Sequence, residues 1–216
     1  MLLPQPAKSN TASTLAPLLE EARVLGFLGP GPVAAHIAHS FAFVAAAEEP
    51  PAVAADLGTG GGVPALVLVH LWPESRWSLV ESNLRRAHWL EQAVIALGAK
   101  ARCQVLAVRA EEVGRSGLRG TCDLVTARGF SPPGPTAECA APLLHPGGSL
   151  LVAGPPDDGP GRWPTAGTSE LGLKYHSTHH YLDDGVPATV TRLVQVAAAP
   201  ERYPRRTGVP VKRPLF

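Results

Sequence analysis

Runs of apolar residues of strand length alternate along this chain with longer runs in which apolar residues recur at helical spacing. Two helical runs come first, at residues 15–25 and 33–47. The alternation that follows predicts strands at 52–57, 76–81, 102–107, 122–127 and 148–153, and helices at 63–71, 83–97, 109–115 and 135–144. Strands that alternate with helices at this spacing favour a doubly wound, parallel α/β sheet.

The pattern changes after the fifth strand. Residues 154–167 are rich in Pro, Gly and Asp without an apolar pattern, so we expect a loop there. Two β-like runs follow, at 171–181 and 188–197, and Asp183-Asp184-Gly185 between them indicates a hairpin turn. Dinucleotide-binding Rossmann domains continue with parallel strands, whereas class I methyltransferases end with an antiparallel strand delivered by a hairpin. The ending therefore favours a class I S-adenosylmethionine-dependent methyltransferase sheet, preceded by two N-terminal helices.

The length of 216 residues fits one domain. Within a single methyltransferase domain spanning 1–216, we expect a helical cap at 1–49, the wound sheet at 50–199 and a basic tail at 200–216. The formal net charge of +1 neither supports nor excludes a nucleic-acid partner, so RNA would have to meet a local basic patch.

The cysteines and histidines show no spacing typical of a metal site, so we expect none. Residues 1–14 lack the basic and apolar regions of a signal peptide. The longest apolar run, 33–47, is interrupted by histidines and is too short to span a bilayer. We therefore expect a cytoplasmic protein without a membrane partner, and a monomer.

The most informative motif is Asp56-Leu57-Gly58-Thr59-Gly60-Gly61-Gly62-Val63-Pro64, which lies between a strand and a helix. Glycines at such a turn let the backbone approach a nucleotide-like ligand closely. Val63 stands where the fingerprint G-x-G-x-x-G of NAD-binding proteins has its third glycine, and the string fits the S-adenosylmethionine form D-x-G-x-G-x-G better. We take Gly58, Gly60 and Val63 as candidate cofactor contacts; a purely structural glycine turn is the alternative.

Three further candidates follow the next three strands. Glu81 ends the second strand, where a carboxylate can accept both ribose hydroxyls of an adenosine, although a solvated strand-end acid would have the same pattern. Ala110-Glu111 follows the third strand, where a class I fold places the adenine ring. Arg128 ends the fourth strand and is a candidate for contacting cofactor or RNA phosphate. The Asn/Asp-Pro-Pro-aromatic motif of exocyclic-amine methyltransferases is not found there, which disfavours that chemistry.

The C-terminal residues 202–214 gather basic side chains around Tyr203, with prolines that we expect to prevent regular structure. Such a segment suits a phosphate backbone, with the tyrosine ring available for base stacking. We take Arg205, Arg206 and Lys212 as candidate RNA contacts; a solvated tail is the alternative.

Together these motifs resemble the bacterial 16S ribosomal RNA guanine-N7 methyltransferases of the RsmG/GidB type. The resemblance rests on Asp56 to Pro64, Leu79-Val80-Glu81-Ser82 with Arg85-Arg86 and Trp89-Leu90, Arg109-Ala110-Glu111-Glu112, Ala127-Arg128, and the tail from Tyr203-Pro204-Arg205-Arg206 to Leu215. It implies that Gly58, Val63, Ala110, Glu111 and Arg128 line an S-adenosylmethionine site. It also implies that 16S rRNA, or a precursor of the small ribosomal subunit, is the partner.

The chain departs from the family pattern mainly on the RNA side. Ala153 precedes Gly154 where the family has lysine, and Gly129 follows Arg128 where the family has alanine. The family's Asn-Leu-Thr element is not found. Only His39-Ser40-Phe41-Ala42 is similar to its His-x-x-Asp/Asn-Ser element.

The implied reaction needs no general base, because guanine N7 carries an in-plane lone pair that can attack the sulfonium methyl group. Proximity, alignment and desolvation then supply the catalysis, and we nominate no catalytic side chain. Three alternatives stay open. They are methylation of a small molecule or another RNA, non-catalytic binding of S-adenosylmethionine, and, least favoured, NAD-dependent oxidoreduction.

Overall fold

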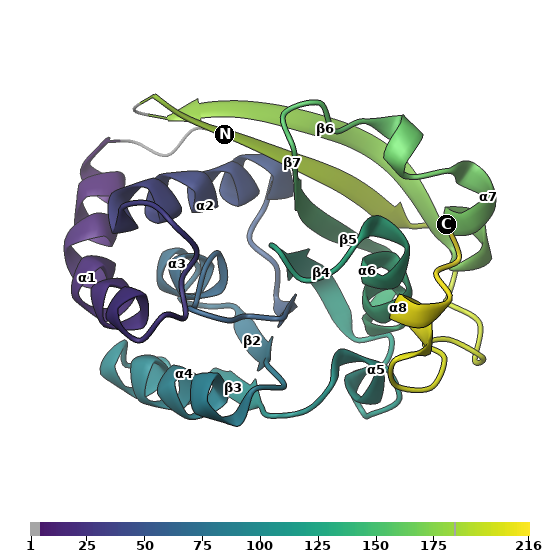
Figure 1. Cartoon of the computed structure of the whole chain (residues 1–216), viewed down its shortest axis with the longest axis horizontal. Helices are drawn as coiled ribbons and strands as arrows, with labels where there is room; N and C mark the ends of the chain where they lie inside the picture. Colours follow the sequence, from purple (N-terminus) through teal and green to yellow (C-terminus); the bar gives the residue numbers. More distant parts are fainter. Residues whose placement is uncertain (1–4, 184) are drawn as a thin grey trace.

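The computed structural model describes residues 5–183 and 185–216, and it has one seven-stranded sheet in the order β3-β2-β1-β4-β5-β7-β6 (Figure 1). The strands are β1 Val53–Leu57, β2 Arg76–Val80, β3 Cys103–Leu106, β4 Cys122–Ala127, β5 Leu144–Gly154, β6 Leu173–Asp183 and β7 Val186–Gln195. The first five run parallel, and β7 pairs antiparallel with both β5 and β6. The predicted wound sheet and its terminal antiparallel hairpin are therefore confirmed.

The helices lie on both faces of this sheet. They are α1 Gln5–Val24, α2 Val33–Ala47, α3 Ala65–Leu71, α4 Leu84–Ala96, α5 Ala110–Val113, α6 Pro133–Ala140, α7 Thr165–Glu170 and α8 Val209–Lys212, with 3-10 turns at Ala141–Leu143 and Pro160–Arg162. Asn83 caps α4, because its side chain accepts hydrogen bonds from the amides of Arg85 and Arg86. This cap explains why the helix begins directly after the second strand.

Three predictions of local structure were wrong. The first helix begins at Gln5 rather than at 15, and its polar early residues are held by tertiary contacts such as the Lys8–Asp183 ion pair. The loop expected at 154–167 contains a 3-10 turn and the start of α7. The tail, expected to lack regular structure, forms α8 with Pro210 in its first turn, where the missing N–H of proline removes no helical bond.

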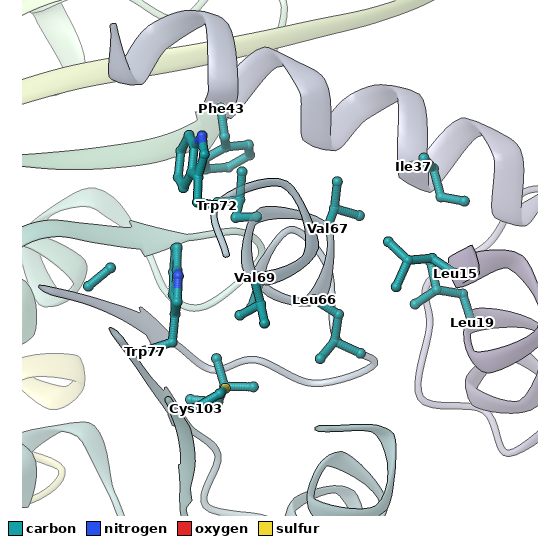
Figure 2. Packing of buried hydrophobic residues seen from close by; sticks show 14 of the residues in the cluster. Leu15, Leu19, Ile37, Phe43, Leu66, Val67, Val69, Trp72, Trp77 and Cys103 are labelled. Carbon is teal, nitrogen blue, oxygen red and sulfur yellow. The ribbon is translucent and has the colours of Figure 1, made fainter. Parts of the chain in front are cut away.

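One face of the sheet carries α1 to α4. Figure 2 shows the packing here, with Leu15 and Leu19 of α1 facing Ile37 of α2 and the α3 side chains Leu66 and Val67 nearby. The strands contribute every second residue to this core, because successive side chains of a strand point to opposite faces. The N-terminal helices thus cover one side of the sheet, as predicted, and they reach the region of the glycine turn.

The opposite face carries α5, α6, α7 and the C-terminal tail (Figure 1). Leu57, Val125 and Leu150 of the sheet pack there with Leu143 and the buried ring of Trp163. The tail residue Tyr203 belongs to the same core. The parallel strands therefore lie between two apolar layers, with the carboxyl ends of β1, β2, β3 and β4 at a common edge.

None of the helices in the part of the chain that the structure describes is long and apolar enough to cross a bilayer.

Candidate functional site

The glycine turn leaves the carboxyl end of β1 and folds back against the end of β2. The amides of Gly58 and Thr59 both donate to the Val80 carbonyl, at 2.8 and 3.1 Å. Gly58, Gly60 and Gly62 have positive φ angles of 67°, 57° and 90°, a conformation that residues with a Cβ rarely adopt. A Cβ at Gly58 would also lie 2.6 Å from Cδ2 of Phe130. The turn therefore requires glycine for both its conformation and its close packing.

Glu81 holds this turn in place. Its Oε2 accepts a hydrogen bond from the Gly60 amide at 2.9 Å, and its Oε1 accepts one from the Asn83 amide at 2.8 Å. The residue is only 6% exposed, so its carboxylate connects the glycine turn to the start of α4 through two buried hydrogen bonds. Each ionised carboxylate oxygen has a second lone pair, so both oxygens can still accept a hydrogen bond from a ligand.

Two adjoining hollows lie at this edge of the sheet. The first, of about 250 Å³, is lined by Glu81, Ala110 and Glu111, and the second, of about 280 Å³, by Gly60, Val63 and Arg128. Gly58, Arg86 and Gly129 line both hollows, which makes them parts of one cleft. The structure thus brings together all seven residues that the sequence nominated for the cofactor. Together the hollows have the size of a typical small-molecule site.

Arg128 lies in the second hollow and is joined to the N-terminal helices. Its Nη2 donates to Nδ1 of His36 at 2.8 Å, while Nε2 of His36 lies 3.2 Å from the Gly29 carbonyl. Burial and the positive charge of Arg128 lower the pKa of His36, so the ring is neutral near pH 7. Burial also lowers the pKa of Arg128, and its Nη1 is buried without a hydrogen-bond partner among the residues that the structure describes. Arg128 therefore places a partly buried guanidinium in the wall of the second hollow.

Asp56 lies directly under the glycine turn and is 1% exposed. Its Oδ1 accepts a hydrogen bond from the Thr126 hydroxyl of the neighbouring strand. Burial is the main cause that raises the pKa of Asp56 to about 7, with a smaller contribution from the charge of Glu81. The carboxyl group is therefore a buried structural element whose ionisation lies close to neutral pH.

The tail residue Arg205, a candidate RNA contact, is engaged within the protein. Its backbone amide, Nε and Nη2 all donate to the carboxylate of Glu138, at 2.8, 2.9 and 2.6 Å. The Glu138 side chain is fully buried, and Nη2 of Arg205 also donates to the Arg213 carbonyl. This paired guanidinium holds the tail to α6. Arg206 and Lys212 are exposed, and they line neither hollow.

The interpretation of Tyr203 as a stacking platform for a base was wrong. Its ring is 4% exposed, and its hydroxyl donates to Glu170 at 2.7 Å. A ring packed into the core on all sides has no free face for a base. Tyr203 is therefore part of the tail's attachment.

Several residues that line the cleft were not nominated as site residues from the sequence. They are Phe27, Leu28, Gly29, His36, Arg86, Phe130, Cys139 and Val211. Arg86 lies over the Phe27 ring, 5.9 Å from its centroid, which joins α4 to the segment between α1 and α2. The helical cap thus contributes one wall of the cleft, and periodicity along the sequence contains no sign of this.

A sequence signal for His36 did exist. The spacing of the family element His-x-x-Asp/Asn-Ser is met by His36, His39 and Ser40, with histidine in place of the acid, and not by the stretch that begins at His39. Ser40 is buried and its hydroxyl donates to the His36 carbonyl at 2.8 Å. Burial and the charge of Arg128 lower the pKa of His39 to about 4.

Within the residues described, no group of three or more His, Cys, Asp or Glu side chains could hold a metal ion.

The fold is that of known methyltransferases. An O-methyltransferase from Bacillus cereus, solved in complex with S-adenosylhomocysteine, matches with a TM-score of 0.60 and 14% identity, covering 84% of this chain and 90% of that chain. An antibiotic-resistance methyltransferase matches with a TM-score of 0.53 and 16% identity, over 72% and 93% of the two chains. The predicted methyltransferase sheet is therefore confirmed.

Sequence comparison is more specific. The ribosomal RNA small subunit methyltransferase G of Syntrophomonas wolfei is 34% identical over 175 residues, which cover 74% of this chain and 75% of that protein. The protein of the same name from Moorella thermoacetica is 32% identical over 185 residues, 83% of this chain and 77% of the relative. The family model described as rRNA small subunit methyltransferase G, GidB, matches residues 32–154. This chain therefore belongs to the rRNA small subunit methyltransferase G family.

Proposed function

We propose that this protein transfers a methyl group from S-adenosylmethionine to N7 of a guanine in 16S ribosomal RNA. The observation that carries the proposal is the single cleft at the carboxyl ends of the strands, which gathers Gly58, Gly60, Val63, Glu81, Ala110, Glu111 and Arg128. Ligands of open α/β sheets bind at this edge. Membership of the family, together with a methyltransferase fold, supports both the cofactor and the substrate class.

Different residues of the cleft suit different groups of S-adenosylmethionine. Glu81 offers carboxylate oxygens to ribose hydroxyls, and the first hollow continues to Ala110, where an adenine ring would lie. The positive-φ glycines bring bare backbone to the middle of the cleft. In the second hollow, the positive charge of the Arg128 guanidinium suits an anionic group of the cofactor or an RNA phosphate.

S-adenosylmethionine supplies an electrophilic methyl group when it is bound. The acids at the cleft are engaged by backbone amides, Glu81 by Gly60 and Asn83, and Glu111 by Gly208. We therefore assign them to binding and positioning rather than to proton transfer. Guanine N7 has a lone pair and needs no proton removed, so alignment in a partly buried cleft accounts for the chemistry.

Exposed cations near the cleft suit the RNA backbone. Arg85 precedes the cleft residue Arg86 on α4, and Arg109 lines the first hollow. Arg206 and Lys212 are exposed on the tail. We keep these two tail residues as the proposed RNA contacts and reassign Arg205 to tail attachment. We further propose that residues 1–216 form one methyltransferase domain and that the protein is cytoplasmic. We also propose that it is a monomer, which size-exclusion chromatography with light scattering can check.

The test is to map N7-methylguanine in 16S rRNA from cells with and without the gene, and from deletion cells that express variants. Wild type and Gly98→Ala should restore methylation, whereas Gly58→Ala should not. Both glycines have positive φ, but a Cβ at Gly98 meets open space and one at Gly58 meets Phe130. Methylation that is unchanged on deletion would refute the proposed function. Binding of S-adenosylhomocysteine without any methylation would instead support the non-catalytic alternative.

A further inference from the structure

The C-terminal tail, residues 200–216, forms part of the wall of the cofactor cleft. Figure 1 shows it in yellow, with α8 beside α5 and α6. Val211 of α8 lines the first hollow together with Glu81, Ala110 and Glu111. Val211 is nevertheless 62% exposed, because most of its side chain borders open space. A ligand in this hollow would cover apolar surface of the tail that the protein itself leaves uncovered.

Glu111 ties this part of the tail to the cleft. The residue is 8% exposed, and its Oε1 accepts a hydrogen bond from the Gly208 amide at 2.8 Å. Gly208 stands directly before α8 and has a φ of 79°, so this bond fixes the point at which the chain turns into the helix that carries Val211. The two bonded residues are 97 positions apart in the chain.

Other contacts anchor the chain ahead of Gly208. Nη1 of Arg119 donates to the Tyr203 carbonyl at 2.8 Å, and its Nη2 donates to the Ala199 carbonyl at 2.9 Å. Arg205 is paired with the buried Glu138, as described above. These anchors lie outside the cleft and hold the tail near it, and the Glu111 bond holds the residue from which α8 begins.

We propose that Glu111 is a positioning residue of the cofactor site, which acts through the tail by holding Gly208 and so placing Val211 against the bound cofactor. The inference rests on the proposed binding of S-adenosylmethionine and deepens it. It assigns the Glu111 carboxylate to the protein's own tail rather than to the adenine ring. It also requires that tail docking and cofactor binding favour each other, because a coupling free energy between two equilibria is reciprocal.

The first experiment is isothermal titration calorimetry with S-adenosylhomocysteine. Val211→Ala should weaken binding about threefold to tenfold, since it removes two methyl groups that the ligand would cover. Val196→Ala is the matched control, because Val196 is 58% exposed and lies outside the cleft. It should bind like wild type.

The same titration separates a positioning role of Glu111 from a direct one. Glu111→Ala should weaken binding, Glu111→Gln should largely retain it because the amide oxygen can still accept from Gly208, and Glu112→Ala should have no effect. In Glu111→Ala the start of α8 loses the bond that fixes it, so adding Val211→Ala should cost less affinity than it does in wild type. Full additivity of the two substitutions would mean that Glu111 acts directly on the cofactor, and would overturn the proposal.

Limited proteolysis provides a second readout, which needs no loss of binding. Arg206 and Lys212 are exposed potential cleavage sites for trypsin on either side of Gly208. Glu111→Ala should speed cleavage there, and S-adenosylhomocysteine should slow it in wild type. Cleavage after Lys100, which is exposed and outside the cleft, is the internal reference.

These experiments distinguish failure of the proposed function from failure of the role proposed for Glu111. Wild type that binds no S-adenosylhomocysteine would remove the proposed function and this inference together. Wild type that binds, with Val211→Ala binding equally well and no protection of the tail, would overturn the inference alone. If Glu111→Ala fails to fold, the exposed Val211→Ala and the protection of the wild-type tail decide the matter.

Discussion

Arg128 and His36 are 92 positions apart, and a hydrogen bond of 2.8 Å joins Nη2 of the arginine to Nδ1 of the histidine. The contact connects the end of β4, at the cofactor cleft, to helix α2 of the N-terminal cap. Nε2 of the same ring lies 3.2 Å from the Gly29 carbonyl, so the ring is held as the neutral tautomer with its proton on Nε2. His36 therefore determines where a buried cation of the cleft points.

Replacing this ring should weaken cofactor binding. His36→Leu removes the acceptor of Arg128 and leaves its guanidinium with two nitrogens unpartnered, so we expect affinity for S-adenosylhomocysteine to fall about tenfold, the effect of one lost hydrogen bond to a charged group. His36→Gln should retain most of the affinity. Calorimetry measures both, with His88→Leu on the exposed surface of α4 as the control. Equal binding by His36→Leu and wild type would contradict this role.

Acid should weaken the same contact. His39 is the next titratable group on the same helix, and its pKa is also lowered. The pKa of His36 is lowered by burial and by the charge of Arg128. Its unfolded pKa is higher, so its contribution to stability is present at neutral pH and is lost as the pH falls below about 6.5. Protonation also turns Nδ1 into a donor that faces a cation. The fall in S-adenosylhomocysteine affinity between pH 7 and 5 should therefore be smaller in His36→Gln than in wild type.

The two neighbouring tail arginines should behave differently. Arg205→Ala leaves the fully buried Glu138 carboxylate unpaired and should destabilise the fold by about 3–5 kcal/mol. Arg206→Ala should leave stability within about 0.5 kcal/mol while it lowers RNA affinity and the salt slope of binding. Urea unfolding measures stability, and filter binding with a 16S rRNA fragment at several salt concentrations measures RNA affinity. The assignment fails if Arg205→Ala is as stable as wild type.

The contribution of Asp56 to the free energy of unfolding should decrease as the pH rises. Its folded pKa is raised to about 7 from 3.8, so the native state holds this proton longer than the unfolded chain does. The contribution is complete below about pH 4 and is lost as the pH rises through 7. Asp56→Asn keeps an acceptor for Thr126 without a charge, so it should gain stability relative to wild type between pH 5 and 8. Urea denaturation of both proteins at pH 5 and at pH 8 tests this. A difference in the free energy of unfolding that is the same at both pH values would contradict the prediction.

The cysteines should be inert in the folded protein. Burial raises the pKa of Cys103 to about 12 and of Cys122 to about 11, and it raises the pKa of Cys139 as well. The thiolate is the reactive form, so none should react with a disulfide reagent at pH 8. All three should react once the chain is unfolded in guanidinium. Fast labelling of Cys139, which lines the first hollow, would mean that the cleft opens more widely than the structure shows.

The gathering of the candidate cofactor residues in one cleft was predictable, because these residues follow the ends of parallel strands. The glycine turn, Glu81 and Arg128 come directly after parallel strands, and Ala110-Glu111 follows β3 after three residues. Parallel strands bring their carboxyl ends to one edge. The order of strands, helices and the final hairpin followed from apolar periodicity and turn residues in the same way. These features depend on neighbours in the chain, so the sequence alone determined them.

Contacts between distant segments decided the rest. Arg205 and Arg206 stand side by side in the same basic tail, yet one pairs with the buried Glu138 and the other faces solvent. Glu111 follows a strand as a cofactor residue would, and its carboxylate accepts a hydrogen bond from Gly208 of the distant tail. A charged side chain takes its role from the partner that packing places within a few ångströms. That partner is set by the tertiary structure, because neither composition nor spacing along the chain records which surfaces meet.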